Sequence, residues 1–181
     1  GNWSPYIPRN LILRYSNEGD MVLDQFVGSG TTLIEAKLLN RNAFGVDINP
    51  SAIRLCKSAI NFDCASKSHI AIRKGNAQKL FFLDSESIDL IATHPPYADI
   101  IKYSEGLSGD LSHLSVKKFI EEVEPVAVES FRVLKKGKMC AIMMGDMRKY
   151  GKVIPLGFKV MECFLKAGFV SKEIIIKEQH N

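Results

Sequence analysis

The sequence predicts an α/β fold with a mostly parallel sheet and helices on both faces. Along the chain, apolar runs of strand length alternate with amphipathic segments of helix length, which is typical of strands joined by crossover helices. The composition fits this prediction, because 181 residues with 46% hydrophobic and 24% charged residues suffice for one soluble domain with a single core. We therefore expect residues 1–181 to form one domain.

A strand, a glycine turn and a helix open the regular part of the chain. Residues 21–26 (MVLDQF) are apolar enough for a buried strand, and the glycines of VGSG at 27–30 end it before a helix over about 31–40. A short helix after Pro8 precedes this unit, and residues 43–48 (AFGVDI) form the second predicted strand.

The next elements continue the alternation. Asn49 and Pro50 predict the start of a helix, because asparagine caps free N–H groups and proline fits the first turn. Residues 69–75 (HIAIRKG) and 87–93 (SIDLIAT) are predicted to be the third and fourth strands. Their order implies that the strand ends lie along one edge of the sheet.

A long amphipathic helix begins the second half. It covers about 115–134 and contains Pro125, which predicts a kink. We expect a fifth strand at 139–145, a helix at 155–166 and a sixth strand at 169–178 (FVSKEIIIKE).

Charge and cysteine content narrow the class of protein. The net charge of +4 permits a nucleic-acid partner without requiring one, and a solvated helix end explains the densest basic cluster, LKKGK at 134–138, as well as such a partner does. No apolar run approaches the ~20 residues of a membrane span, so we expect a cytoplasmic protein. We expect reduced core thiols rather than disulfides or a metal site at Cys56, Cys64, Cys140 and Cys163.

The turn after the first predicted strand is a candidate ligand site. Gly28 and Gly30 allow a sharp turn and a close approach of the backbone to a ligand at the carboxyl edge of the sheet. Leu33 stands where the dinucleotide fingerprint has its third glycine, and the turn also lacks the ending of a P-loop.

Asp47 ends the second predicted strand and is a candidate ribose ligand. Its carboxylate can accept hydrogen bonds from both hydroxyls of a ribose, as in nucleotide-binding α/β folds. A cap of the helix that follows Asn49 is the structural alternative. A nicotinamide-dependent oxidoreductase would use the same glycine turn and the same acid, but it would leave the next motif without a role.

The motif THPPY at 93–97 ends the fourth predicted strand. Proline fixes φ and lacks a donor, so the ladder stops and the turn is stiff. His94, when neutral, and the carbonyl of Pro95 provide two acceptors that can hold an amino group, and Tyr97 provides a flat face for a base. An ordinary strand-ending turn with a packed tyrosine is the alternative.

Together, DQFVGSGTT, GVDINP and THPPY resemble the S-adenosylmethionine-dependent DNA methyltransferases that modify exocyclic amines, the cytosine-N4 and adenine-N6 enzymes of restriction–modification. The resemblance spans nearly the whole chain. Residues 1–17 look like the segment that covers the methionine end of the cofactor, and 98–114 stand in the place of a variable loop. It implies a Rossmann-like methyltransferase fold, S-adenosylmethionine as cofactor, and double-stranded DNA with a base flipped into the site.

Site residues follow from the matched motifs. The resemblance implies cofactor binding by Asp24, Phe26, Gly28, Gly30, Thr31, Asp47, Ile48 and Asn76. It implies a catalytic loop of His94, Pro95, Pro96 and Tyr97, and no metal. Three positions depart from the family's usual residues, because Gln25 replaces proline, Asn76 replaces aspartate, and His94 replaces aspartate or serine. The last departure leaves the choice between adenine and cytosine open.

Other functions share parts of this pattern. RNA and protein-glutamine amine methyltransferases use the same Pro-Pro-Tyr chemistry, and a non-catalytic nucleic-acid-binding module would keep the fold without the reaction. Carbon-5 cytosine methylation is disfavoured, because no cysteine lies between Cys64 and Cys140 to act as nucleophile. The chain opens on Gly1 and holds one of the family's two final strands, so we expect a fragment of a longer protein.

Overall fold

A parallel sheet forms the centre of the protein. The computed structural model describes residues 3–96, 110–149 and 151–177. Among these residues, a five-stranded sheet has the order β3-β2-β1-β4-β5, and every neighbouring pair is parallel. Its strands are β1 (Met21–Asp24), β2 (Asn42–Asp47), β3 (Ile70–Lys74), β4 (Ile88–Thr93) and β5 (Leu134–Ile142). The α/β fold predicted from the alternating pattern is confirmed.

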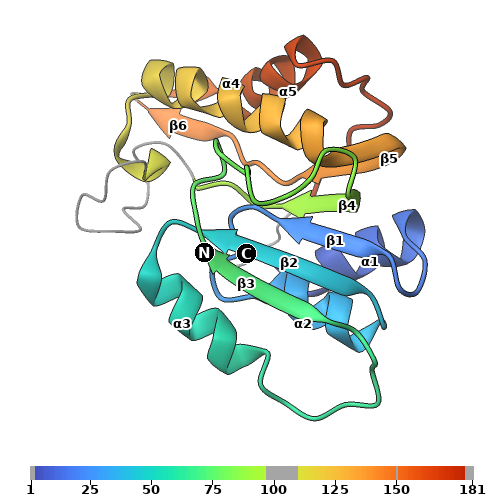
Figure 1. The fold of residues 1–181 in the computed structure, drawn as a ribbon. Coiled ribbons are helices and arrows are strands. Elements are labelled where there is room, and N and C mark those ends of the chain that lie inside the picture. Colours follow the sequence, from blue (N-terminus) through green and yellow to red (C-terminus); the bar gives the residue numbers. More distant parts are fainter. Residues whose placement is uncertain (1–2, 97–109, 150, 178–181) are drawn as a thin grey trace.

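Helices cover both faces of this sheet (Figure 1). One face carries α1 (Tyr6–Tyr15), α2 (Thr31–Leu38) and α3 (Pro50–Ala59), and the other carries α4 (Val116–Val133), on which α5 (Leu156–Lys166) packs. Ile12, Leu33 and Ile53 from the first three helices share one buried cluster with strand residues. A short 3₁₀ helix, η1 (Leu111–His113), precedes α4.

The topology puts a ligand crevice at the end of β1. Chain order runs outward from β1 in both directions, with β2 on one side and β4 on the other. Parallel sheets bind ligands at such a switch point, outside the carboxyl ends of the strands. All six residues of β4 are buried, so the turn that follows Thr93 starts from a rigid base.

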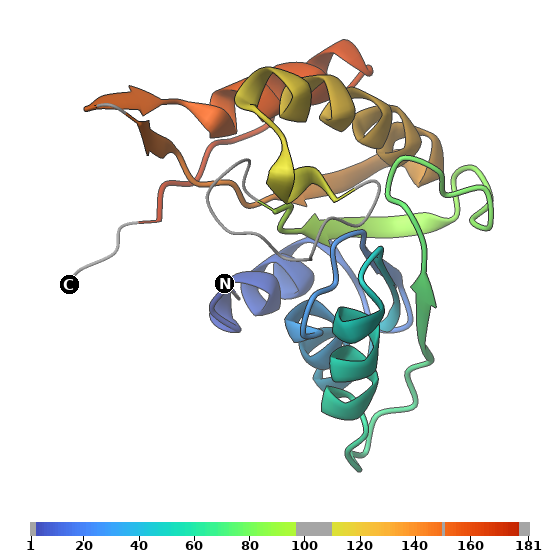
Figure 2. The ribbon, with the colours of Figure 1, turned by 90° about the vertical axis from the view of Figure 1, so that its left-hand side faces the viewer.

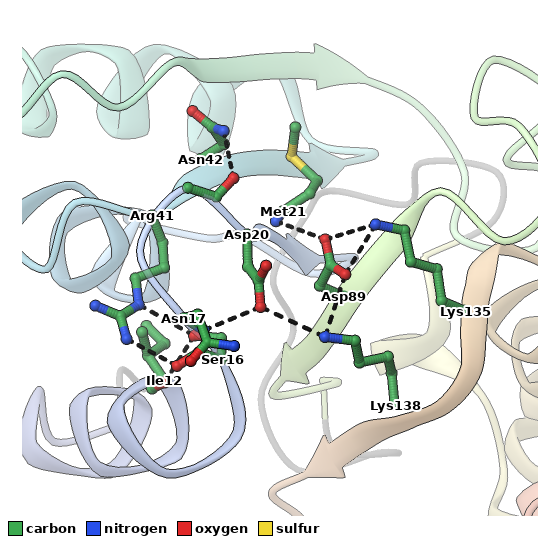
Figure 3. A network of polar contacts seen from close by, with 11 residues as sticks. Ile12, Ser16, Asn17, Asp20, Met21, Arg41, Asn42, Asp89, Lys135 and Lys138 are labelled. Carbon is green, nitrogen blue, oxygen red and sulfur yellow. Dashed lines mark hydrogen bonds and ion pairs between the residues drawn. The ribbon is translucent and has the colours of Figure 1, made fainter.

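The basic cluster at 134–138 is part of the sheet, and its explanation as a solvated helix end is wrong. These residues begin β5, and they lie at the amino edge, opposite the crevice. Lys135 Nζ donates to both oxygens of Asp89, at 2.8 and 2.9 Å, and Lys138 Nζ lies 3.5 Å from Asp20 (Figure 3). Both lysines are therefore engaged by carboxylates.

The predicted sixth strand is also wrong. Residues 169–177 carry no strand, and Val170 and Ile176 are 89% and 83% exposed. The segment instead contacts the end of α1, where Glu173 accepts a hydrogen bond from the Tyr15 hydroxyl and pairs with Arg14. The last residues, 178–181, lie outside the described part of the chain.

A small hairpin that the sequence did not predict follows β5. Its antiparallel strands are β6 (Met147–Lys149) and β7 (Lys152–Ile154), and it projects beyond the sheet (Figure 2). Met147 is buried and joins the cluster between α4 and α5. The alternation of strands with long helices gave no sign of such a short antiparallel pair.

Several smaller expectations need correction. The first helix begins at Tyr6 and includes Pro8, which the first helical turn tolerates. Cys64 is exposed rather than part of the core, whereas Cys56 and Cys163 are buried. Tyr97 and most of the variable loop 98–114 lie outside the described residues. Within the described part, no helix is long and apolar enough to cross a membrane.

Candidate cofactor cleft and catalytic turn

The two glycines of the turn after β1, Gly28 and Gly30, differ in what a side chain at each position would meet. Both have positive φ, 50° at Gly28 and 93° at Gly30, where side chains are strained. A Cβ on Gly30 would lie 2.7 Å from Cys56 Sγ, so packing against α3 demands a glycine. A Cβ on Gly28 would meet nothing closer than the Phe26 carbonyl at 3.9 Å. The turn is therefore open on the side of Gly28.

Asp47 joins the end of β2 to the glycine turn. Its Oδ2 accepts a 2.9 Å hydrogen bond from Gly28 N, and its Oδ1 accepts one of 2.8 Å from Asn49 N. The helix α3 has its own cap, because Asn49 Oδ1 accepts from Ser51 N. Burial raises the pKa of the Asp47 carboxyl above its ordinary value. Each carboxylate oxygen keeps a further lone pair for a ligand hydroxyl.

A small cleft lies beside Ile48, the residue that follows Asp47. It is lined by Gln25, Phe26, Ile48, Gly75, Asn76, Ala77, Leu111 and Val126. Three residues that the sequence predicted to contact a cofactor, Phe26, Ile48 and Asn76, thus share one cleft. Most of the lining is apolar, and it comes from the segments that follow β1, β2 and β3, from η1 and from α4.

The side chain of Asn76 is already engaged within its own loop. Its Oδ1 accepts from Gln78 N at 2.9 Å, and its Nδ2 donates to Gln78 Oε1 at 3.2 Å. Gln78 is held in turn, because its Nε2 donates to the carbonyl of Glu122 in α4. These bonds fix the Asn76 side chain at the cleft, and one amide proton and one lone pair of its oxygen remain for a ligand.

Asp24 links the glycine turn to the end of β4, where the turn at His94 begins. The side chain is 2% exposed, and its carboxylate accepts from Phe26 N, from Thr32 Oγ1 at 2.5 Å and from Thr93 Oγ1 at 2.8 Å. Burial raises the pKa of this carboxyl to about 6, although the three donors oppose the shift. The three elements that meet here are the end of β1, the start of α2 and the end of β4. The sequence did not single out Thr32 or Thr93 for this role.

His94 begins the turn that follows β4. Its ring lies 5.9 Å from that of Trp3, with 32° between the planes, and Trp3 is 5% exposed. Burial lowers the pKa of His94 to about 4, so the imidazole is neutral at pH 7. Pro95 is buried and Pro96 is partly buried. Trp3, in the segment before α1, thus packs against His94, a contact that the sequence did not reveal.

Clusters of metal-ligating side chains are absent from the described part of the chain. Nowhere in it do three or more His, Cys, Asp or Glu side chains come close enough together to hold an ion. Asp110, at the start of η1, is 8% exposed, and its charge helps to raise the pKa of Asp47. The Asp47 carboxylate thus faces the glycine turn and lies within electrostatic reach of Asp110.

Comparison with known proteins supports a methyltransferase. Residues 4–58 match the family model described as DNA methylase. The Type II methyltransferase M.HpaI of Haemophilus parainfluenzae is 51% identical over 51 residues, which are 28% of this chain and 16% of that protein. The tRNA (guanine(10)-N2)-dimethyltransferase of Pyrococcus abyssi is 26% identical over 144 residues, 79% of this chain and 39% of that protein. The chain thus spans less than half the length of either relative.

Solved structures agree on the fold. An S-adenosylmethionine-dependent methyltransferase from Methanosarcina mazei has a TM-score of 0.56 and 23% identity, covering 78% of this chain and 57% of the other. The Rossmann-like methyltransferase fold is confirmed, as is the resemblance to the N4/N6 family. These similarities also bear out S-adenosylmethionine as the cofactor that the resemblance implies.

Proposed function

We propose that this protein transfers a methyl group from S-adenosylmethionine to an exocyclic amine in DNA, the N4 of cytosine or the N6 of adenine. The observation that supports it best is the convergence of three loops at adjacent strand ends. They are the glycine turn after β1, Asp47 after β2 and the His94 turn after β4, and the buried Asp24 ties the first to the third.

The cleft provides the groups that would hold the cofactor. Asp47 offers lone pairs to the ribose hydroxyls, and Ile48 offers an apolar surface to the adenine. Phe26 and the open side of Gly28 are proposed to face the methionine portion. S-adenosylmethionine, when bound, supplies a methyl group made electrophilic by its sulfonium. The protein's main contribution is to hold this cofactor in line with the target amine.

His94 is proposed to hold that amine. An exocyclic nitrogen is a weak nucleophile, because its lone pair is delocalised into the ring. A neutral His94 ring nitrogen and the Pro95 carbonyl can each accept an N–H from the amine, which draws the nitrogen toward tetrahedral geometry. Once the nitrogen has gained its methyl group it must lose a proton, and the imidazole of His94 offers a base for it.

DNA is the proposed substrate because the family model that matches residues 4–58 is described as DNA methylase. A duplex target must be flipped into the crevice at a cost of a few kcal/mol. Stacking on Tyr97, which lies outside the described residues, is proposed to offset about 1–3 kcal/mol of this cost.

RNA is the second candidate substrate. The tRNA dimethyltransferase matches 79% of this chain, whereas M.HpaI matches 28%, and guanine N2 is also an exocyclic amine. A methyl-transfer assay separates the two substrates. The protein is incubated with S-adenosylmethionine and either duplex DNA or tRNA, and nucleosides are identified by mass spectrometry. N4-methylcytosine or N6-methyladenine from DNA is expected, and methylation of tRNA alone would replace the DNA proposal.

The same preparation tests the cofactor site. Asp47→Ala is expected to weaken S-adenosylhomocysteine binding about tenfold or more in calorimetry, because the ribose acceptor and the Gly28 contact are both lost. Asp63→Asn is the matched control, since Asp63 is an exposed carboxylate in the loop after α3. Equal affinity of both variants would contradict the role of Asp47.

A further inference from the structure

Trp3, the single tryptophan of the chain, lies just before α1 and is buried. It is 5% exposed, and it belongs to the cluster that also contains Ile12 of α1 and Ala92 of β4. A tryptophan side chain buries a large apolar area, so these contacts fix the indole against the core. A side chain that packs on Trp3 therefore meets a wall that does not move aside.

The side chain of His94 packs on this wall. Its ring centroid lies 5.9 Å from that of Trp3, the two planes are tilted by 32°, and the residue is only partly exposed. His94 directly follows Thr93, the last residue of β4, whose residues are all buried. The strand end thus holds its backbone and the indole holds its ring. Because packed rings are not free to rotate into their neighbours, the contact restricts the orientation of the imidazole.

The indole also keeps water from the part of the imidazole that it covers. Burial is the largest cause of the lowered pKa of His94, because an imidazolium loses its hydration there. The positive charges of the amino terminus and of Lys177, in the last described segment, lower this pKa further. Among the described residues, Trp3 is the aromatic partner of the His94 ring, so it contributes to the larger cause.

We propose that Trp3 is a positioning residue for methyl transfer, whose indole holds the His94 ring in place and keeps it dry, so that the imidazole meets the target amine as a neutral acceptor. This inference rests on the proposed role of His94. The resemblance implies that residues 1–17 cover the methionine end of the cofactor. Trp3 gives the same segment a second role, at the turn proposed to hold the amine.

Nuclear magnetic resonance measures the state of His94 without any substrate. The chain has four histidines, so the His94 signal is identified by its loss in His94→Asn. In the wild-type protein we expect no midpoint of this signal between about pH 5 and 8. In Trp3→Ala the pKa of His94 is expected to rise by about one unit or more, into this range. Trp3→Phe keeps an aromatic wall and is expected to titrate like the wild-type protein.

Lys177→Gln separates the effect of the indole from that of charge. It removes a positive charge and leaves Trp3 in place, so the pKa of His94 is expected to rise less than in Trp3→Ala. A larger rise in Lys177→Gln, or an unchanged titration in Trp3→Ala, would overturn the inference. If Trp3→Ala does not fold, Trp3→Leu replaces it, because leucine keeps an apolar contact with the core but has no ring. The same direction of shift is then required.

Methyl transfer distinguishes positioning from a general loss of structure. Trp3→Ala is expected to lower kcat about tenfold while binding S-adenosylhomocysteine within about threefold of wild type in calorimetry. Phe81→Ala, at an aromatic residue that is 80% exposed, is the control and is expected to match the wild-type protein. Equal losses of kcat and cofactor affinity in Trp3→Ala would contradict a positioning role. If the wild-type protein methylates neither DNA nor RNA, the proposed function is wrong, whereas the titration of His94 still decides whether Trp3 shields the ring.

Discussion

The hydroxyl of Thr93 donates a 2.8 Å hydrogen bond to the carboxylate of Asp24, from the last residue of β4 to the last residue of β1. This bond connects the turn that begins at His94 with the turn that begins at Gln25. The turn after β4 and the glycine turn after β1 are thereby tied to one buried side chain, since Asp24 also accepts from Thr32.

Removing the Thr93 hydroxyl is expected to loosen this connection. Thr93→Val keeps the shape and removes one donor from a charged acceptor, which costs about 1.5–3 kcal/mol of unfolding free energy. Urea unfolding measures this loss. Thr93→Ser keeps the hydroxyl and is expected to lose clearly less, and a Ser variant as unstable as the Val variant would point to packing instead.

The raised pKa of Asp24 predicts an unusual pH dependence of the free energy of unfolding. Its pKa is raised to about 6 in the folded protein, so the folded state binds a proton more tightly than the unfolded state does. This carboxyl therefore favours folding fully below its unfolded pKa of about 4, and the contribution is lost as pH rises to about 6, by up to about 3 kcal/mol.

Asp24→Asn isolates this contribution. Stability is measured by urea unfolding from about pH 4 to 7 for both proteins, and other titrating groups cancel in the difference. Because an amide in place of the carboxyl does not titrate, the wild-type protein is expected to lose stability relative to the variant across this range. A constant difference between the two proteins would show that Asp24 titrates normally.

The lowered pKa of His94 predicts that the methyl-transfer activity is insensitive to mild acid. Burial keeps its pKa at about 4, so the imidazole stays a neutral acceptor well below its ordinary pKa of 6.5. As the pH is lowered through that ordinary value, we therefore expect the rate of methyl transfer to show no titration step. His94→Ala is expected to lower the transfer rate by about 10²-fold without weakening cofactor binding. His69→Ala, at an exposed histidine, serves as the control, and an equal effect of both variants would exclude the proposed role.

The close packing of Gly30 on Cys56 predicts that a substitution at one residue can partly offset the destabilisation caused by a substitution at the other. Gly30→Ala forces a Cβ to within 2.7 Å of Cys56 Sγ at a φ of 93°, which is expected to destabilise the protein by about 1–3 kcal/mol. Cys56→Ala added to it removes the clash but not the backbone strain. A double-mutant cycle is therefore expected to show partial recovery, and strictly additive losses would contradict the proposed contact.

The sequence predicted the strands that are apolar throughout, and it failed where a strand begins with charged residues. Runs such as MVLDQF and SIDLIAT are buried on both faces, so their apolar character alone marked β1 and β4. The lysine-rich start of β5 was mistaken for a helix end, because its charges are paired with Asp89 and Asp20 from distant parts of the chain. Composition cannot show such partners.

The strand prediction for residues 169–177 failed for the opposite reason. Their aliphatic, β-branched composition favours a strand, but a strand also needs a partner, and pairing depends on the whole sheet. At the site, motif spacing brought Phe26, Ile48 and Asn76 to one cleft. It could not show that Gln78 occupies the Asn76 amide or that Trp3 covers His94, because both contacts depend on side-chain orientation.

The exposed isoleucines of the last described segment also affect how the protein behaves at high concentration. Ile174, Ile175 and Ile176 are 59%, 67% and 83% exposed, and such a run is a template for intermolecular cross-β pairing. Lys172 and Glu173 precede the run and Lys177 follows it, so charged residues flank it on both sides and oppose its pairing with other chains. Self-association of this protein should therefore increase when salt screens those charges.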